Sequence, residues 1–337
     1  MLTRSEVVPY LLRRGLIEAK SVVDGDLTIV DASRRNHNFG ILRERGFSYL
    51  LKQGTDAERR ETIANEALVY SSLRLDPYLP RLVHYDSDEH VLILEYLTGA
   101  RDLHEHQIRT GRFSSRLASS IGRALSILHR APWRDEFFVH QAPWVLSVHR
   151  PNLESLCDTS GANLQVIKIV QQSAEYCELL DALRAEWRAE ALIHFDLKWD
   201  HCLVSSARLK IIDWEIAGVG DPDWDVGSIF SSYLHSWLRS IPITGETPPD
   251  RFLQFARYPL EKIQPALRAF WRSYAGDAAD ERLLRTVRYA AARLTQAAYE
   301  QMQTVSEIGG TAVCALQLGL NILRRPQEAA RHLLGIA

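Results

Sequence analysis

One stretch decides the fold of this chain: His194-Phe195-Asp196-Leu197-Lys198-Trp199-Asp200-His201-Cys202-Leu203. An apolar run at residues 191–193 precedes it, and residues 209–213 form another short apolar strand that ends in Asp213. Asp196 and Asp213 therefore stand at the mouths of adjacent short strands, where loops converge and catalytic groups gather. A plain β-hairpin with acidic side chains on its surface is the alternative interpretation.

The bulk composition limits the class of protein. The 337 residues suffice for one large domain or two lobes, and 46% hydrophobic with 24% charged residues is ordinary for a globular protein. A net charge of -2 gives no general attraction to nucleic acid or to an anionic membrane. The four cysteines lack metal or redox spacing, and no apolar run approaches the roughly 20 residues that span a bilayer. Because a signal peptide is also missing from the pattern, we expect a cytoplasmic protein.

The N-terminal part predicts a short helix followed by strands. Thr3 and Glu6 have the spacing of a capping box, and Gly15 can end the helix that they begin. The pattern then alternates as in strands, with a tight turn at Gly46. The strands are expected at residues 27–31, 39–42 and 47–52.

A buried ion pair is predicted next. Thr55 and Glu58 have capping-box spacing and open a helix that runs to about Leu73. Glu66 lies in the apolar stripe of this helix, where a carboxylate is costly without a cation. Lys52, on the preceding strand, is the candidate partner. The alternative is a surface lysine and a glutamate at the edge of the helix.

The rest of the chain is mainly helical. Two more strands, at 82–86 and 91–96, lead to Gly99, and helical spacing follows at 117–128, at about 164–188 and after Asp213. Breaks are expected at Pro242 to Pro249 and at Pro326. Because strands and helices are segregated rather than alternating, the pattern favours an α+β fold over a doubly wound sheet.

These motifs resemble a known family. His194, Asp196 and Asp213 resemble the kinase catalytic loop His-Arg-Asp-x-x-x-x-Asn and its metal-binding Asp-Phe-Gly. The wording is closer to the aminoglycoside phosphotransferase and choline kinase-like family, whose loop reads roughly His-Gly-Asp-Leu-His-Pro-Gly-Asn. The resemblance covers nearly the whole chain and implies a bilobal, protein-kinase-like fold. Its N-lobe would be an antiparallel sheet plus helix at 1–96, its hinge 97–99, and its mainly helical C-lobe 100–337.

The resemblance implies ATP and Mg²⁺ as cofactors and a role for each motif residue. Asp196 would accept or orient the proton of the attacking hydroxyl, and Asp213 would hold Mg²⁺ through hard oxygen ligands. Lys198 would steady the transferred phosphoryl group, unless it is a solvated loop lysine. His194 is interpreted as a structural support of the loop.

The same resemblance implies which residues would bind the nucleotide. Lys52 and Glu66 would form the pair that holds the α and β phosphates, and backbone groups of Glu95 and Leu97 would contact the adenine edge. Downstream, residues 220–227 read Gly-Asp-Pro-Asp-Trp-Asp-Val-Gly, similar to a family turn in which Asp225 braces the catalytic loop. A helix N-cap is the other role open to Asp225.

Two departures from the family pattern stand out. His201 occupies the position of the asparagine that binds a second metal, and imidazole is a poor ligand for Mg²⁺, so Mn²⁺ is an alternative. The chain also lacks a glycine-rich phosphate loop. Arg35 and Asn36 could contact the phosphates instead, or could simply be solvated.

The acceptor is inferred from a narrower resemblance. This chain resembles the phosphotransferase-type Ser/Thr peptide kinases of thioamitide and class V lanthipeptide biosynthesis. The resemblance lies in the sequences around Asp196 and Asp213 and in the tail Leu-Gly-Leu-Asn-Ile-Leu-Arg-Arg-Pro. This resemblance implies a ribosomally made precursor peptide, with a leader and a Ser/Thr core, and a separate lyase partner that eliminates the phosphate. A small-molecule kinase and a pseudokinase that binds a peptide or partner remain alternatives.

Overall fold

The computed structural model describes residues 1–32, 37–157, 159–205, 208–242, 255–276 and 280–336. The chain folds into two compact units, the first made of Met1–Leu103 with Asp200–Ala217 and the second of His104–Trp199 with Gly218–Ala337. The α+β architecture expected from the sequence is confirmed. We predicted an N-lobe that ends at residue 96 and a C-lobe that begins at residue 100, whereas the first segment of the first unit ends at Leu103. The prediction also did not include residues 200–217 in the first unit.

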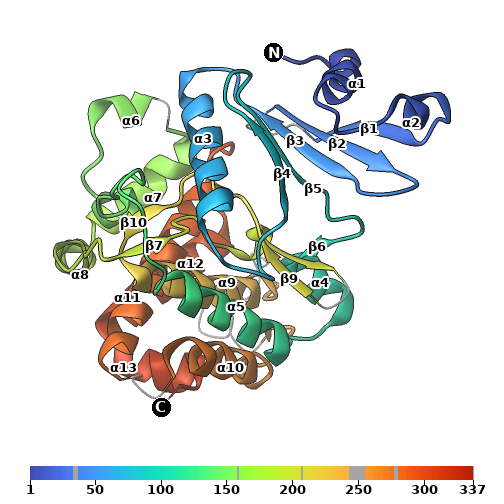
Figure 1. Ribbon diagram of the computed structural model, residues 1–337. Coiled ribbons are helices and arrows are strands. Elements are labelled where there is room, and N and C mark those ends of the chain that lie inside the picture. The colour runs from blue at the N-terminus through green and yellow to red at the C-terminus, as the bar shows by residue number, and fades with distance from the viewer. Residues whose placement is uncertain (33–36, 158, 206–207, 243–254, 277–279, 337) are drawn as a thin grey trace. The chain divides into compact units, whose positions relative to one another are not determined.

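The first unit contains a five-stranded antiparallel sheet (Figure 1). Its strand order is β1-β2-β3-β5-β4, so the last two strands in the sequence exchange places. The expected strands are all present, with ends that differ by up to two residues from those we predicted. The bounds are β1 Leu27–Asp31, β2 His37–Arg43, β3 Tyr49–Gln53, β4 Leu82–Asp86 and β5 Val91–Glu95.

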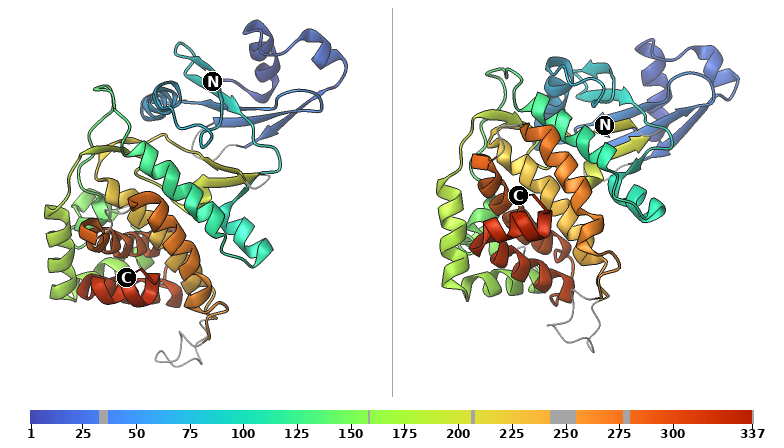
Figure 2. Two further views of the ribbon diagram at one scale, coloured as in Figure 1. Left: turned by 60° about the horizontal axis from the view of Figure 1, so that its bottom comes forward. Right: turned by 90° about the horizontal axis from the view of Figure 1, so that it is seen from below.

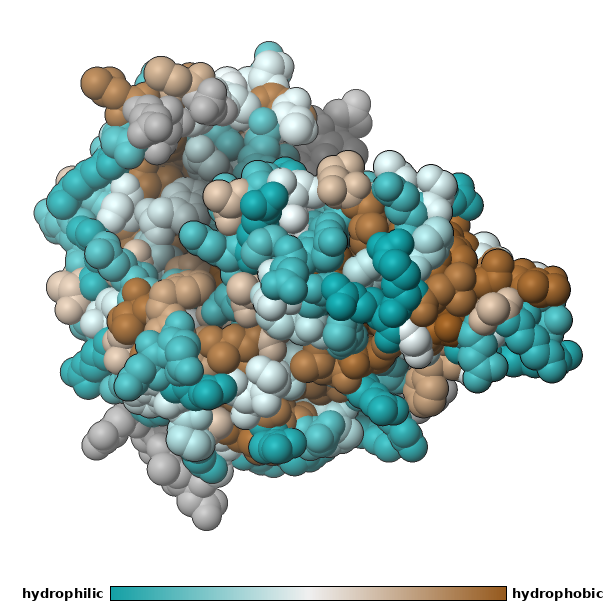
Figure 3. Space-filling view, turned by 45° about the horizontal axis from the view of Figure 1, so that its top comes forward, coloured by the Kyte–Doolittle hydropathy of each residue, from teal (hydrophilic) through white to brown (hydrophobic). Residues whose placement is uncertain are grey.

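Two short helices precede the sheet, α1 (Arg4–Arg13) and α2 (Ala19–Val23). The capping box is confirmed, because the Thr3 N–H donates to the Glu6 carboxylate at 2.8 Å. The apolar face of α1 joins the core that strands β2, β3 and β5 supply. Val23 and Val30 are exposed around α2 and β1, and Figure 3 shows apolar surface at this end.

Helix α3 (Ala57–Ser72) packs on the sheet (Figure 1). The helix begins one residue later than we predicted. Asp56 is its N-cap and accepts a hydrogen bond from the Arg59 N–H at 2.9 Å. The prediction that Thr55 caps the helix is therefore wrong. The Asp56 carboxylate reaches the otherwise unpaired N–H of N3, Arg59, while the Thr55 hydroxyl accepts from the Arg59 side chain.

A small sheet explains why residues 200–217 group with the first unit. Strand β8 (Cys202–Ser205) pairs with β9 (Arg208–Ile211) on one side and with β6 (Arg101–Asp102) on the other. The Ile211 N–H donates to the carbonyl of Tyr78 at 2.7 Å. These hydrogen bonds attach the hairpin to the segments that flank β4 and β5, although about a hundred residues of sequence separate β6 from β8.

The second unit is mainly helical. Helices α5 and α10 lie side by side, as both views of Figure 2 show. Two three-residue strands, β7 (Ala191–Ile193) and β10 (Gly218–Gly220), pair in antiparallel fashion. Strand β7 precedes the loop at residues 194–200, which we call the catalytic loop after the kinase motif that it resembles. The helices are α4 Leu103–Thr110, α5 Ser115–Leu128, α6 Leu153–Cys157, α7 Gly161–Gln171, α8 Ala174–Ala185, α9 Pro222–Arg239, α10 Gln264–Ala275, α11 Asp280–Gln301, α12 Gly310–Arg324 and α13 Pro326–Ala329.

The helix that we expected over about 164–188 is two helices. Helix α7 ends at Gln171, and α8 begins after Ser173, whose hydroxyl accepts a hydrogen bond from the Tyr176 N–H at 3.2 Å. The apolar periodicity continues across the break, so spacing alone could not reveal it. A serine competes for backbone N–H groups and favours a new helix start.

Helices α9 and α11 pack closely and carry residues that support the catalytic loop. A Cβ atom at Gly227 of α9 would lie 2.8 Å from the Tyr289 Cβ and 2.9 Å from the Thr286 carbonyl oxygen of α11. Only a glycine therefore permits this approach of the two backbones. Among the described residues, none of the helices is long and apolar enough to cross a membrane.

We predict that Gly227→Ala lowers the free energy of unfolding by about 1–3 kcal/mol, because the added methyl group overpacks the contact between α9 and α11. Denaturation in urea measures the change. The control is Ser232→Ala on the same helix, which removes only a bond to the Ser228 carbonyl and should change stability by less than about 0.5 kcal/mol. Equal stability of the two variants would contradict the predicted crowding.

Candidate active site

The first unit brings three of the predicted residues together. The Lys52 Nζ atom lies 2.6 Å from Glu66 Oε2 and 3.2 Å from Asp213 Oδ1. Lys52 is on β3, Glu66 is on α3, and Asp213 follows β9, so three separate elements meet at one ammonium group. The buried lysine–glutamate pair that we inferred from the apolar stripe is present, and it also holds the carboxylate expected to bind a metal.

Burial and the neighbouring charges act in opposite directions on this group. Glu66 is fully buried and burial raises its pKa, although Lys52 opposes the shift. Burial also disfavours the charge on Lys52, but Glu66 and Asp213 outweigh it and raise the pKa of the ammonium group. Lys52 therefore stays charged at neutral pH. Among the described residues, Glu66 Oε1 has no hydrogen-bond partner, so this oxygen can still accept a hydrogen bond.

His201 lies beside the metal-binding candidate. Its Nε2 atom is 3.2 Å from Asp213 Oδ2, so the two oxygens of Asp213 face Lys52 and His201. No cluster of three or more His, Cys, Asp or Glu side chains that could hold a metal occurs in the described part of the chain. Asp213 still fits Mg²⁺, because this ion is commonly held by one or two carboxylates with the substrate phosphates and water completing its coordination.

The second unit holds the other carboxylate of the predicted pair. Lys198 Nζ lies 2.8 Å from Asp196 Oδ2, and Arg293 Nη2 lies 3.4 Å from Asp196 Oδ1. The first contact joins two residues of the loop, and the second comes from helix α11. Each oxygen of Asp196 thus faces its own cation.

The backbone of the catalytic loop is held by Asp225. Its fully buried carboxylate accepts hydrogen bonds from the His194 N–H at 2.7 Å and the Phe195 N–H at 3.0 Å. Burial opposes ionisation of Asp225, but its contacts with His129 and His194 outweigh burial and lower its pKa. The N-cap of α9 is Asp221, not Asp225, so the first of the two roles considered for Asp225 is the one that its contacts fit.

The loop needs this support because of its backbone conformation. Phe195 has φ of 71°, a left-handed conformation that is unfavourable for a bulky side chain. The family loop that this segment resembles, His-Gly-Asp, has glycine at the position of Phe195. Here the ring of Phe195 stacks on His140 with centroids 3.8 Å apart, and its carbonyl accepts the Trp224 indole N–H at 2.7 Å. Aromatic packing and hydrogen bonds therefore replace the freedom of a glycine.

The remaining predicted contacts are with the nucleotide. The Glu95 N–H already donates to the Arg81 carbonyl, and the Leu97 carbonyl accepts from the Ala100 N–H. An adenine ring would therefore bond to the other backbone group of Glu95 or Leu97. The predicted phosphate contacts of Arg35 and Asn36 lie outside the described residues.

Several supporting residues were not predicted from the sequence. Asn65, next to Glu66, donates to the carbonyls of Ala217 at 2.8 Å and Glu215 at 3.1 Å, which ties α3 to the segment after Asp213. Arg293 had no local signal at all. An amide beside the buried glutamate was a usable hint for Asn65, whereas nothing near Arg293 distinguishes it from the other arginines of α11.

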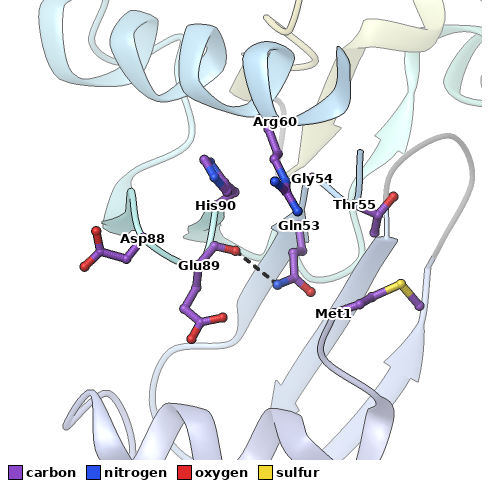
Figure 4. A pocket seen from close by; sticks show the side chains of 8 residues that line it. All are labelled: Met1, Gln53, Gly54, Thr55, Arg60, Asp88, Glu89 and His90. Carbon is purple, nitrogen blue, oxygen red and sulfur yellow. Dashed lines mark hydrogen bonds between the residues drawn. The ribbon is translucent and has the colours of Figure 1, made fainter. Parts of the chain in front are cut away.

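A separate pocket of about 150 Å³ lies at the C-terminal end of β3 (Figure 4). Gln53 is its centre, accepting the Leu2 N–H at 2.7 Å and donating to the Glu89 carbonyl at 3.1 Å. Because its lining mixes one arginine with two acids, it shows no marked preference for phosphate. The lining residues are Met1, Gln53, Gly54, Thr55, Arg60, Asp88, Glu89 and His90.

Comparison with known proteins identifies the family. The family model described as "Phosphotransferase enzyme family" (APH) matches residues 26–246, which is more than half of the chain. The chain belongs to this phosphotransferase family. The match includes Lys52, Glu66, Asp196, Asp213 and Asp225, but it does not extend to Arg293. No curated protein is similar enough in sequence to match this phosphotransferase.

Solved structures share the fold of this phosphotransferase at low sequence identity. An ethanolamine kinase from Plasmodium vivax aligns with a TM-score of 0.58 and 12% identity, over 96% of this chain and 90% of its own. A choline kinase from Cryptosporidium parvum aligns with a TM-score of 0.57 and 12% identity, over 98% of both chains. The aminoglycoside phosphotransferase APH(2'')-Ib, bound to ADP, aligns with 0.51 and 14%, over 94% and 97%. At this identity the likeness establishes the fold.

We predict that His201→Asn shifts the metal preference of the enzyme from Mn²⁺ toward Mg²⁺, because an amide oxygen suits Mg²⁺ better than an imidazole nitrogen. The measurement is the rate of phosphate transfer from ATP as each metal is titrated. If wild type and variant respond alike to both metals, His201 is not a ligand and serves only to orient Asp213.

A second prediction concerns pH and stability. Burial and the neighbouring Asp223 raise the pKa of Asp221 to about 6 from an ordinary value of 3.8, against the attraction of Arg285. Between these two values the folded protein keeps a proton that the unfolded chain has lost, so this group makes stability fall as pH rises from about 4 to about 6. The loss is on the order of 3 kcal/mol, since one pKa unit corresponds to about 1.4 kcal/mol.

Urea denaturation of wild type and Asp221→Asn across this pH range tests that sign. The difference between their free energies of unfolding should move in favour of the variant up to about pH 6 and then level off. Parallel pH curves would show that Asp221 titrates normally in the folded protein.

Proposed function

We propose that this phosphotransferase transfers the terminal phosphoryl group of ATP to a serine or threonine hydroxyl of a ribosomally made precursor peptide. The observation that supports this acceptor is the 2.8 Å contact between Lys198 and Asp196. Lysine at this place is typical of protein Ser/Thr kinases. Choline, ethanolamine and aminoglycosides, the acceptors named by the structural neighbours, are cations, and a lysine on the acceptor-side carboxylate opposes their approach.

In this mechanism each carboxylate has one task. Asp196 orients the acceptor hydroxyl and takes its proton as the oxygen attacks the γ-phosphorus, while the bond from phosphorus to the leaving oxygen of ADP breaks. Lys198 releases its contact with Asp196 and contacts the oxygens of the transferred phosphoryl group instead. Lys52, held by Glu66, contacts the phosphates of ATP. Mg²⁺ bound through Asp213 would supply neutralisation of the phosphate charge.

The product would be a phosphopeptide that a separate lyase consumes. Removal of the Cα proton and departure of phosphate from the Cβ carbon of phosphoserine or phosphothreonine leave a dehydroamino acid. This proposal places both proteins in the cytoplasm, where ATP and the newly made precursor are present. Partners of this kind need neither nucleic acid nor membrane.

We predict that wild type phosphorylates Ser/Thr peptides, and that Asp196→Asn lowers the rate by about 10²–10⁴-fold while ATP still binds, because general base catalysis contributes that much. The acceptors are a degenerate Ser/Thr peptide library, choline, ethanolamine and kanamycin. Mass spectrometry detects phosphate gain. The matched control is Asp200→Asn, an exposed acid of the same loop, which should retain activity.

The outcomes separate the three candidate functions. Phosphorylation of choline, ethanolamine or kanamycin but of no peptide would replace our proposal with a small-molecule kinase. Binding of ATP without transfer to any acceptor would indicate a pseudokinase. Lys52→Ala serves as the nucleotide control, since it removes the cation beside Glu66 and should weaken ATP binding.

A further inference from the structure

Helix α11 places one arginine on the acceptor-side carboxylate. Arg293 is 97 residues from Asp196 in the sequence, yet its Nη2 atom lies 3.4 Å from Asp196 Oδ1. The arginine side chain is only 7% exposed, whereas the Lys198 side chain, which faces the other oxygen, is 33% exposed. Of the two cations, Arg293 is therefore the confined one.

Arg293 is also held from its other side. Its guanidinium lies over the ring of Trp224, 5.3 Å from the centroid, where a cation is attracted by the ring electrons. Trp224 is buried and donates its indole N–H to the carbonyl of Phe195 at 2.7 Å. The residue that precedes Asp196 and the arginine that contacts Asp196 thus share one aromatic support.

This confinement distinguishes the two oxygens of Asp196. Lys198 has a flexible stem and partial exposure, so it can leave Oδ2 when a phosphoryl group offers it a better anion. Arg293 is stacked and buried, so it stays on Oδ1. The acceptor hydroxyl would then meet Oδ2, while Oδ1 keeps the carboxylate in a fixed orientation.

The same three side chains contribute to the local charge. One carboxylate and two cations, Asp196 with Lys198 and Arg293, sum to +1. An acceptor that carries an ammonium group beside its hydroxyl would be repelled, and one with a carboxylate there would be attracted. Arginine is permanently charged, so the contribution of Arg293 to this bias does not change with pH.

We propose that Arg293 is a positioning residue that fixes Asp196 through Oδ1, and that with Lys198 it selects acceptors whose hydroxyl is flanked by neutral or acidic groups rather than by cations. The proposal rests on the proposed function only in taking Asp196 as the group that receives the hydroxyl. It adds a residue outside the segment matched by the family model, and it specifies the charge of the acceptor.

The test of positioning compares Arg293→Gln and Arg293→Lys with Arg288→Gln. Arg288 lies on the same helix but pairs with Glu186 rather than with Asp196. We expect Arg293→Gln to lower kcat by about 10–100-fold, because small misplacement of a catalytic group has effects of this size, with the KM for ATP unchanged. Arg293→Lys should recover part of the rate, and Arg288→Gln should match wild type.

A pH profile separates positioning from a general loss of structure. Without the neighbouring guanidinium the acidic limb of kcat/KM should move to higher pH in Arg293→Gln, since a positive charge favours the ionised carboxylate. Thermal unfolding and ATP binding establish that each variant is folded. An unchanged or increased kcat in folded Arg293→Gln would overturn the positioning role. If that variant does not fold, Arg293→Met is judged by the same criteria.

The charge preference is tested on wild type first, so it does not depend on any variant folding. Matched peptides carry Glu, Gln or Lys beside one acceptor serine, and the ratio of their kcat/KM values is measured. We expect Glu and Gln to exceed Lys by about 10-fold or more, since repulsion of about 1.4 kcal/mol is a factor of ten. Arg293→Gln should reduce the ratio several-fold. A preference for Lys would overturn the inference.

Failure of the proposed function gives a different result. If no peptide is phosphorylated but choline, ethanolamine or kanamycin is, the peptide acceptor is wrong and the charge preference is overturned with it. The positioning role is then decided by the kcat and pH profile of Arg293→Gln on that small molecule. Transfer to peptides that is insensitive to Arg293 would instead leave the proposed function standing and remove this inference alone.

Discussion

The catalytic loop depends on one buried charge. Asp225 is completely inaccessible to solvent, and a carboxylate in that position requires hydrogen bonds to stay ionised. It obtains them from the backbone N–H groups of His194 and Phe195 and from the imidazole of His129 at 3.3 Å. The same hydrogen bonds stabilise Phe195 in the left-handed conformation, which is unfavourable for a bulky side chain. The contact therefore offsets both the burial of the Asp225 charge and the backbone strain at Phe195, and it fixes the chain direction just before Asp196.

Helices α9 and α11 extend this support. Asp221 and Asp223, at the start of α9, are fully buried and paired with arginines of α11, including a 2.8 Å bond from Arg285 to Asp223. Buried ion pairs contribute little net stability when desolvation is counted, but breaking one is costly, so they hold geometry more than they add free energy. The pairing holds the N-terminal part of α11 against the start of α9, and Arg293 lies farther along the same helix.

The two units use the same device for their two carboxylates. In the first, Asp213 has Lys52 at one oxygen and His201 at the other. In the second, Asp196 has Arg293 at one oxygen and Lys198 at the other. In each pair one partner is a deeply buried cation from a distant element, and the other comes from the catalytic loop or its end. A carboxylate that is held through one oxygen keeps its orientation.

Local features of the chain were readable from the sequence alone. Residue alternation predicted the strands, and the Lys52–Glu66 pair followed because a glutamate in an apolar stripe requires a cation. The N-cap at Asp56 and the break at Ser173 were missed, since neighbouring polar residues offer several equivalent helix starts. The tertiary structure alone decided which arginine meets Asp196 and which histidine meets Asp225. Those partners are 97 and 96 residues apart, and their meeting depends on how α11 and α5 pack, to which no local propensity refers.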